Sequence, residues 1–363
     1  MTSSLASRQI SFRLKSTLCG WARLAAGALL LTMTLTVAQA DWFSESRELS
    51  GEEVTVQICD DDATSASRSI AAVFTEIERI QQLMSAELEG SAVFAINLRA
   101  GSEAVAVDHE LYNLIVRALD ISILTRGAFD ITIESVGQHY DFDAGRQPDE
   151  ETRRREIAAS GYRSVKLNTR RQTIRFANPE VKINLGGILS GYSVERGLEI
   201  LIERGVENAI VTAGGDSKVL GDRFGEPWIV GIRDPRDAAQ VIARLPLREQ
   251  AISTSGDYVR YFQEGDKRIH HILEPTTGLP ASGVSSATVI GPDAVITDAL
   301  ATSVFVLGVE KGIRLLATLP DYEGIIIDTE GVLHYSEGLA VPAIPEARQP
   351  METPESGVEG PAS

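Results

Sequence analysis

Cysteine is nearly absent from this sequence of 363 residues, which contains only two. Cys19 lies ahead of an apolar run in the first forty residues, so a chain cleaved behind that run keeps Cys59 alone. A single thiol forms no intramolecular disulfide, and without a CxxC motif the sequence offers no zinc or iron–sulfur site. The five histidines lack HxxxH spacing, which argues against a transition-metal site built from histidine.

Positive charge is also scarce, because 34 Lys and Arg residues face 51 Asp and Glu residues, giving a net charge of −17. Nucleic acid and anionic membrane surfaces repel such a chain, so neither is expected as a partner. No apolar run has the length and flanks of a good transmembrane helix, so we expect no stable membrane insertion. No Gly-Lys-Ser/Thr follows the glycine-rich segments, which excludes a P-loop.

Both ends of the chain differ in composition from its middle. Four basic residues between positions 8 and 23 precede the apolar run from Leu24 to Val37, which ends in Ala-Gln-Ala at Ala40. These features predict a secretory signal peptide over residues 1–40, hence an exported or periplasmic protein with a net charge of about −21 after cleavage. Residues 341–363, rich in proline and glutamate, are predicted to form a disordered acidic tail.

The middle of the chain, residues 48–340, is predicted to be one α+β domain, because its strands outnumber its helices without alternating regularly with them. Apolar periodicity predicts a long helix, capped by Ser65 or Ser67, that ends near Met84, and a second helix capped by Asp108. Another helix is expected near Gly191. The predicted strands cover residues 53–58, 163–167, 173–176, 181–184, 209–212, 228–232, 241–245, 251–254, 287–290 and 324–328.

Asp298 and Thr302 stand four residues apart in a stretch with helical apolar spacing, so their side chains project from the same helix face. A carboxylate and a hydroxyl are hard oxygen ligands of the kind that Mg²⁺ uses together with substrate phosphates and water. The alternative is an ordinary amphipathic helix with a polar pair at its rim.

Further short motifs interrupt the predicted elements. They are Gly127–Thr132 (GAFDIT), Asn184–Tyr192 (NLGGILSGY), Gly214–Asp216 (GGD), Thr254–Tyr258 (TSGDY), His271–Gly278 (HILEPTTG) and Thr297–Thr302 (TDALAT). An isolated glycine pair is most simply a tight turn or a bulge. In this order and spacing, however, the motifs resemble the ApbE-type FAD:protein FMN transferase family, and the resemblance extends from Val54 to Ser336.

The resemblance implies a T-fold-like α+β architecture with a smaller part that closes over the flavin. It implies a Mg²⁺ ion held by Asp298, Thr302 and the backbone carbonyl of Gly187. It also implies that FAD is the substrate and lies against Asn97, Ala128, Phe129, Asp130, Asn184, Ser190, Gly214, Gly215, Asp216, Ser255, Gly256 and Ile272. For Asp130 and Asp216, bonding within their own turns is an equally good interpretation.

The sequence departs from the family pattern at several positions. Asn184 replaces an aspartate, Ser190 replaces a lysine, and Glu274 replaces an aspartate. Ser50-Gly51-Glu52 stands where the family has Met-Gly-Thr, and Glu87 falls near a position that is aromatic in many members. The metal motif is intact, whereas the flavin-binding motifs are altered.

The activity implied is transfer of FMN from FAD to a Thr or Ser hydroxyl of an exported flavoprotein of a membrane electron-transfer complex, with release of AMP. His271 is the expected general base, and its neighbour His270 is expected to face solvent. Two alternatives remain at this stage: a Mg²⁺-dependent FAD pyrophosphatase that releases FMN and AMP, and a non-catalytic exported FAD-binding protein.

Overall fold

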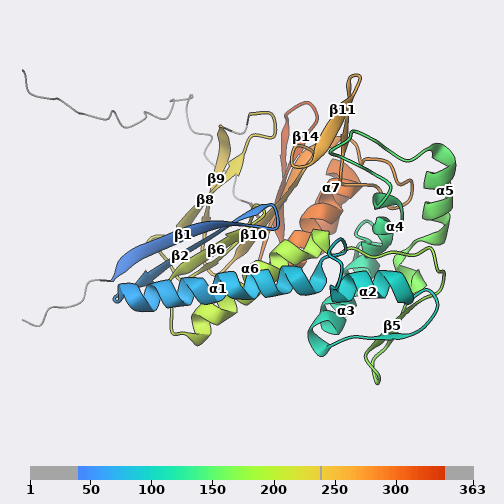
Figure 1. Cartoon of the computed structure of the whole chain (residues 1–363). Coiled ribbons are helices and arrows are strands. Elements are labelled where there is room, and N and C mark those ends of the chain that lie inside the picture. Colours follow the sequence, from blue (N-terminus) through green and yellow to red (C-terminus); the bar gives the residue numbers. More distant parts are fainter. Residues whose placement is uncertain (1–39, 238, 340–363) are drawn as a thin grey trace, which may run out of the picture. The chain divides into compact units, whose positions relative to one another are not determined.

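The computed structural model describes residues 40–237 and 239–339, so the expected signal peptide and acidic tail lie outside the described residues, apart from Ala40. Its centre is an antiparallel sheet of eight strands in the order β1-β2-β6-β7-β10-β13-β14-β15 (Figure 1). The strands are β1 (Asp41–Leu49), β2 (Glu52–Asp60), β6 (Ala209–Ala213), β7 (Asp216–Leu220), β10 (Ala251–Gly256), β13 (Val284–Gly291), β14 (Glu323–Asp328) and β15 (Leu333–Tyr335).

Helices cover one face of this sheet. α1 (Ala63–Met84) packs beside α6 (Gly186–Glu203), α6 packs beside α7 (Ala294–Leu316), and α7 lies on β10 and β13 (Figure 1). The β8 (Trp228–Arg233) and β9 (Val241–Leu247) hairpin covers the other face. Successive side chains of a strand point to opposite faces of the sheet, so one strand can pack against both layers. Val211 of β6 is buried towards α1 and α6, whereas its neighbour Ile210 packs with the hairpin.

A smaller part is built from residues between β2 and β6. It contains α2 (Ala92–Arg99), α3 (His109–Leu124), α4 (Glu134–Gly137), α5 (Glu150–Ala159), short 3₁₀ turns at Ile131–Ile133 and Tyr162–Ser164, and a sheet of β3 (Val105–Ala106), β5 (Thr173–Phe176) and β4 (Val165–Asn168). A further hairpin, β11 (Tyr261–Glu264) and β12 (Lys267–His270), leads to the histidine motif. The predicted α+β class is confirmed.

Local signals explain where the long helices begin. Asp62, rather than Ser65 or Ser67, caps α1, since its carboxylate accepts a hydrogen bond from the Ser65 amide at 2.6 Å. Asp108 caps α3 as predicted, through the Leu111 amide. The sheet begins at Asp41, ahead of the domain boundary expected at residue 48 and directly after the expected cleavage point.

The strand predicted at residues 181–184 is wrong. The side chain of Asn97 takes the place of a neighbouring strand: its amide donates to the Ile183 carbonyl and its oxygen accepts from the Ile183 amide, both at 2.8 Å. The Asn184 amide donates to the carbonyl of Ile131. Apolar residues bury this segment, and side-chain bonds satisfy its backbone without a ladder. No helix in the described part of the chain has the length and apolar character to cross a bilayer.

Candidate functional site

The three expected metal ligands come together where the start of α6 packs against the N-terminal half of α7. Oδ2 of Asp298 accepts a hydrogen bond of 2.9 Å from the Gly191 amide. Oγ1 of Thr302 lies 3.1 Å from Oγ of Ser255 on β10, and 3.5 Å from the place that a Cβ on Gly187 would occupy. Asp298 is only 6% exposed, so the pair does not lie on a solvated rim of the helix.

Asp216 lies against Asp298 rather than capping its own turn. Its carboxyl group accepts a hydrogen bond from Ser253 and is close enough to Asp298 for a hydrogen bond between the two. Burial raises the pKa of both groups, and the charge of Asp298 raises the pKa of Asp216 further. Neither carboxyl group has a basic partner among the ion pairs of the described residues. Such a buried pair needs a shared proton or a cation.

These residues fit a divalent cation. Among residues 40–237 and 239–339, no three His, Cys, Asp or Glu side chains form a complete metal cage. Mg²⁺ binds through one or two carboxylates and completes its shell with water and substrate phosphates. Asp298, Thr302 and the Gly187 carbonyl would hold it, with Asp216 beside them.

The glycine-rich turn places the start of α6 beside this pair. α6 begins at Gly186 without a capping side chain on the preceding residue, and Gly187 departs from helical geometry at φ −85° and ψ 15°. Amides of a first helical turn lack intrahelical partners and favour phosphate. Asn184 supports the turn, because its side-chain oxygen accepts the Gly186 amide at 2.7 Å. An amide acceptor thus fills the role expected of the family's aspartate.

The GAFD segment lies beneath this turn. Phe129 is buried, and a Cβ on Gly187 would lie 3.2 Å from its ring. Asp130 accepts hydrogen bonds from the amide and hydroxyl of Thr132 and from the Tyr162 amide, so its carboxylate organises its own loop. Ala128 is buried too. Of the two interpretations of Asp130, the structure shows the bonds of the turn.

Gly214 and Gly215 form the two-residue turn between β6 and β7. Their φ values of 59° and 98° are the positive values that a tight hairpin turn needs at both central positions. A Cβ on Gly214 would lie 3.1 Å from Oγ of Ser190 and 2.9 Å from Oε2 of Glu52. The turn therefore brings its backbone against both side chains and directs Asp216 towards Asp298.

The histidine motif follows β12, and here one prediction is wrong. His270 is 4% exposed, packs edge-on against Phe305 of α7, and places Nε2 3.0 Å from the carbonyl of Ala281. His270 is therefore the core residue, because it ends β12 on the side that faces α7, while the exposed residue is His271. Ile272 is buried behind it, and Gly256 makes room for the ring of Tyr258.

His271 is accessible to solvent, although much protein surrounds its ring. This crowding lowers its pKa to about 4, so the ring is neutral at pH 7. Nδ1 lies 3.2 Å from the Arg260 carbonyl and must donate a proton to it, which leaves the lone pair on Nε2. A neutral ring with a free nitrogen can accept a proton, and its lowered pKa makes it a weaker base than an ordinary histidine.

Sequence reasoning assigned no role at the site to two acidic residues, of which Glu52 was noted only as a departure from the family pattern. Glu134 accepts a hydrogen bond of 3.1 Å from the Asn184 side chain, and burial raises its pKa to about 7. Glu52 contacts Ser190 at 3.2 Å. Neither belongs to a motif that pairs carboxylates along the chain, so only spatial proximity shows that they lie at the site. Glu87, at the expected aromatic position, is exposed and lies 4.0 Å from Arg260.

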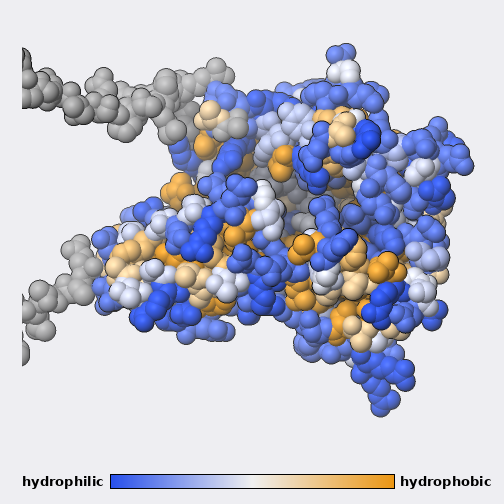
Figure 2. Space-filling view, in the orientation of Figure 1, coloured by the Kyte–Doolittle hydropathy of each residue, from blue (hydrophilic) through white to orange (hydrophobic). Residues whose placement is uncertain are grey.

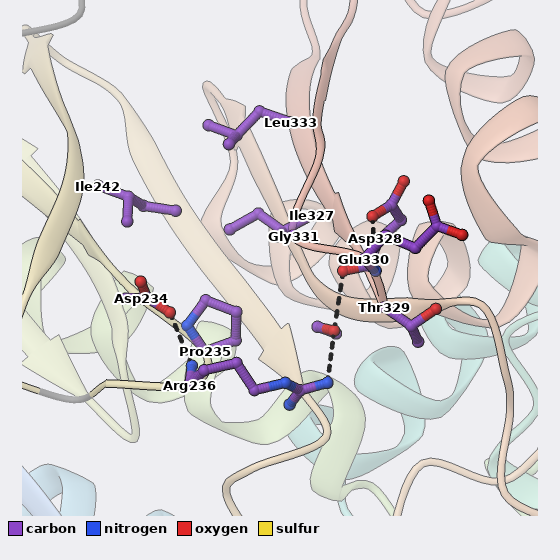
Figure 3. Close-up of a pocket in the computed structure, with 11 residues that line it drawn as sticks. Asp234, Pro235, Arg236, Ile242, Ile327, Asp328, Thr329, Glu330, Gly331 and Leu333 are labelled. Carbon is purple, nitrogen blue, oxygen red and sulfur yellow. Dashed lines mark hydrogen bonds between the residues drawn. The ribbon is translucent and has the colours of Figure 1, made fainter.

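Two cavities accompany these residues. One of about 660 Å³ adjoins the site, since its lining includes Ala128, Glu274 and Val306, which follows Thr302 by one turn of α7. Figure 2 shows a hollow near the middle of one face, close to where α6 and α7 converge in Figure 1. The other, of about 150 Å³, contains none of the predicted site residues; there Arg236 reaches Ser285 (Figure 3).

Comparison with known proteins matches this chain to one family. A sequence profile of the ApbE family matches residues 50–326. An FAD:protein FMN transferase of Treponema pallidum is 31% identical over 76% of this chain and 82% of the relative. One of Klebsiella pneumoniae is 32% identical over 78% of this chain and 89% of the relative. The crystal structure of the ApbE protein of Thermotoga maritima superimposes with a TM-score of 0.76 at 33% identity, covering 82% of this chain and 97% of that one.

Proposed function

The chain belongs to the ApbE family, and on that premise we propose that it transfers FMN from FAD to a Thr or Ser hydroxyl of an acceptor protein and releases AMP. The proposal rests on one arrangement above all: the first turn of α6, suited to phosphate, adjoins the buried Asp216–Asp298 pair, suited to a divalent cation. A diphosphate bridged by Mg²⁺ needs both features at one place.

The residues have separate tasks in the reaction. When bound, Mg²⁺ would act as a Lewis acid that neutralises charge on the diphosphate. Amides of the α6 first turn would bind the phosphate oxygens and orient them. The acceptor hydroxyl would attack the FMN phosphorus, forming a new P–O bond as the bond to the AMP phosphate breaks, and Nε2 of His271 would accept its proton. AMP would leave with the electron pair of the broken bond.

FAD would lie across the site from the Asn184 side to the 660 Å³ cavity beside Ala128. Asn97, Phe129 and Asp130 would act by holding the backbone that faces the substrate, because their polar or aromatic groups are engaged within the protein. Because His271 is open to solvent, water could replace the acceptor, which would make the enzyme an FAD pyrophosphatase.

A single incubation tests the proposal. The chain from Asp41 onward is mixed with FAD, Mg²⁺ and an exported flavoprotein, and AMP is measured by chromatography while FMN on the acceptor is measured by in-gel fluorescence. Transfer predicts equal amounts of AMP and protein-bound FMN. AMP with free FMN indicates the pyrophosphatase, and FAD binding without AMP indicates a binding protein.

We also propose that the enzyme is exported and that its acceptors are exported flavoproteins of membrane electron-transfer complexes. The basic and apolar leader that ends at Ala40 supports this, together with the start of β1 at Asp41. Mass spectrometry of the protein recovered from a cell envelope fraction should find Asp41 as the first residue. A full-length chain in the cytoplasm would contradict the export proposal without affecting the proposed activity.

A further inference from the structure

Glu52 points into the site from the first position of β2. Its carboxylate oxygens lie 3.2 and 3.4 Å from Oγ of Ser190 on α6. Strand alternation explains the direction, because Glu52 lies on the face of β2 that carries Val54 and Val56 towards the helices, whereas Glu53 points the other way and is exposed. Glu52 and Glu53 are thus adjacent acidic residues on opposite faces of one strand.

The neighbours of Glu52 connect it to the buried carboxyl pair. Ser190 precedes Gly191, whose amide binds Asp298, and Gly214 is two residues before Asp216. The negative charge of Glu52 raises the pKa of both Asp216 and Asp298. Glu52 itself takes part in no ion pair of the described residues, and burial raises its own pKa. Three acidic groups therefore share one region in which no basic side chain is paired with any of them.

The two residues in contact are both departures from the family pattern. Where that pattern has a threonine and a lysine, this chain has Glu52 and Ser190. The exchange removes one positive charge and adds one negative charge beside the place where a diphosphate is proposed to bind. Such a change raises the electrostatic cost of binding an anion unless a cation is bound more firmly nearby.

We propose that Glu52 strengthens the binding of the divalent cation at the Asp298–Thr302 site, acting across a metal-bound water and held in place by Ser190. Glu52 is a positioning residue in this role, because the described residues contain no complete cage of three carboxylates around one point. A carboxylate that accepts a hydrogen bond from a metal-bound water typically changes metal affinity 10- to 100-fold. The inference depends on the metal part of the proposed function and not on the acceptor.

The test is a titration with Mn²⁺, followed by electron paramagnetic resonance, on the metal-free chain from Asp41 onward without FAD. Glu52→Gln should raise the dissociation constant for Mn²⁺ at least about tenfold, while keeping the shape of the side chain and a hydrogen-bonding group for Ser190. Glu53→Gln is the matched control, since it removes the same charge from the next residue, and it should bind Mn²⁺ as the unaltered protein does. Thermal melts of both variants confirm that they fold.

A second pair of variants tests the effect of restoring the lysine that the family pattern has at the position of Ser190. Glu52→Thr combined with Ser190→Lys should bind Mn²⁺ more weakly than the unaltered protein and bind FAD more tightly in the absence of metal, because an ammonium group then faces the diphosphate. Ser190→Lys alone should show little gain in FAD affinity, because Glu52 would pair with the new lysine.

Asp298→Ala distinguishes a failure of the metal site from a failure of the role of Glu52. If it abolishes Mn²⁺ binding while Glu52→Gln leaves the dissociation constant within twofold, the metal site stands and the role of Glu52 is wrong. If Asp298→Ala binds Mn²⁺ normally, the metal is elsewhere, and the metal part of the proposed function fails together with this inference.

Discussion

The backbone amide of Gly191 donates a hydrogen bond of 2.9 Å to Oδ2 of Asp298, which joins the first turns of α6 to the first turns of α7. The contact requires glycine. A Cβ on Gly191 would lie 2.4 Å from the Ala294 carbonyl oxygen and 2.7 Å from Cβ of Asp298. Glycine at this position therefore lets the two helices approach closely enough for their functional groups to form one site.

Gly191→Ala should separate the helices. Although alanine normally stabilises a helix relative to glycine, overpacking against the Ala294 backbone should lower the free energy of unfolding by about 1–3 kcal/mol. Urea denaturation measures this, and Mn²⁺ titration should show weaker metal binding in the folded variant. Gly231→Ala on β8 is the control, because its new methyl group would meet only the Val241 side chain, at 3.1 Å. Equal stability of Gly191→Ala and the unaltered protein would contradict the close approach.

Asp298→Ala should remove stabilisation by Mg²⁺ while leaving the metal-free fold intact. A ligand present at 100 times its dissociation constant stabilises a folded protein by about 2.7 kcal/mol, and the variant should lose that increment. Thermal melts with and without Mg²⁺ measure it. Asp321→Ala, at an exposed position, should keep the full increment. A Mg²⁺-dependent shift that persists in Asp298→Ala would show that the metal ligand has been misassigned.

The two adjacent histidines should respond in opposite ways. His271→Ala should retain FAD affinity and lose FMN transfer by at least about 10²-fold, the lower end for a missing general base. His270→Ala should instead lose about 2–5 kcal/mol of stability, because it leaves a cavity against Phe305. Single-turnover release of AMP and urea denaturation distinguish them. Loss of FAD binding in His271→Ala, with transfer per bound FAD preserved, would make His271 a binding residue.

Glu134 should give the protein a measurable pH dependence of stability. Its pKa is raised from 4.5 to about 7 by burial, so the folded state disfavours the ionised form. Glu134→Gln should therefore be more stable than the unaltered protein at pH 8, the advantage should shrink as the pH falls below 7, and it should vanish below about pH 4.5. Thermal melts across this range test it. An advantage that does not vary with pH would rule out titration of Glu134 as the cause.

The hydrogen bond between Asn184 and Glu134 also determines what Asn184→Asp should do. Restoring the family's aspartate there would remove the amide group that donates to Glu134 and would place a second carboxylate against it. Asn184→Asp should consequently weaken stability at pH 8 and should not tighten FAD binding. Adding Glu134→Gln to Asn184→Asp should recover the loss. The partner at residue 134 thus decides the effect of a substitution at a position where the sequence shows only a departure from the family pattern.

The sequence by itself determined much of the local structure and the chemical character of the site. Residue spacing placed Asp298 and Thr302 on one helix face, the cap at Asp108 on α3, and the strand at residues 173–176, because these features depend on neighbours within a few residues. The ordered motifs also identified the family, since each one is a short contiguous run.

Only the tertiary structure decided which side chains meet. Asp216 meets Asp298 because the hairpin turn before it directs its side chain towards α7, and Glu52 contacts Ser190 because α6 packs against β6, which pairs with β2. His270 rather than His271 is buried because Phe305 packs against that side of β12. Such contacts join residues tens to hundreds of positions apart, and local sequence patterns carry no information about them.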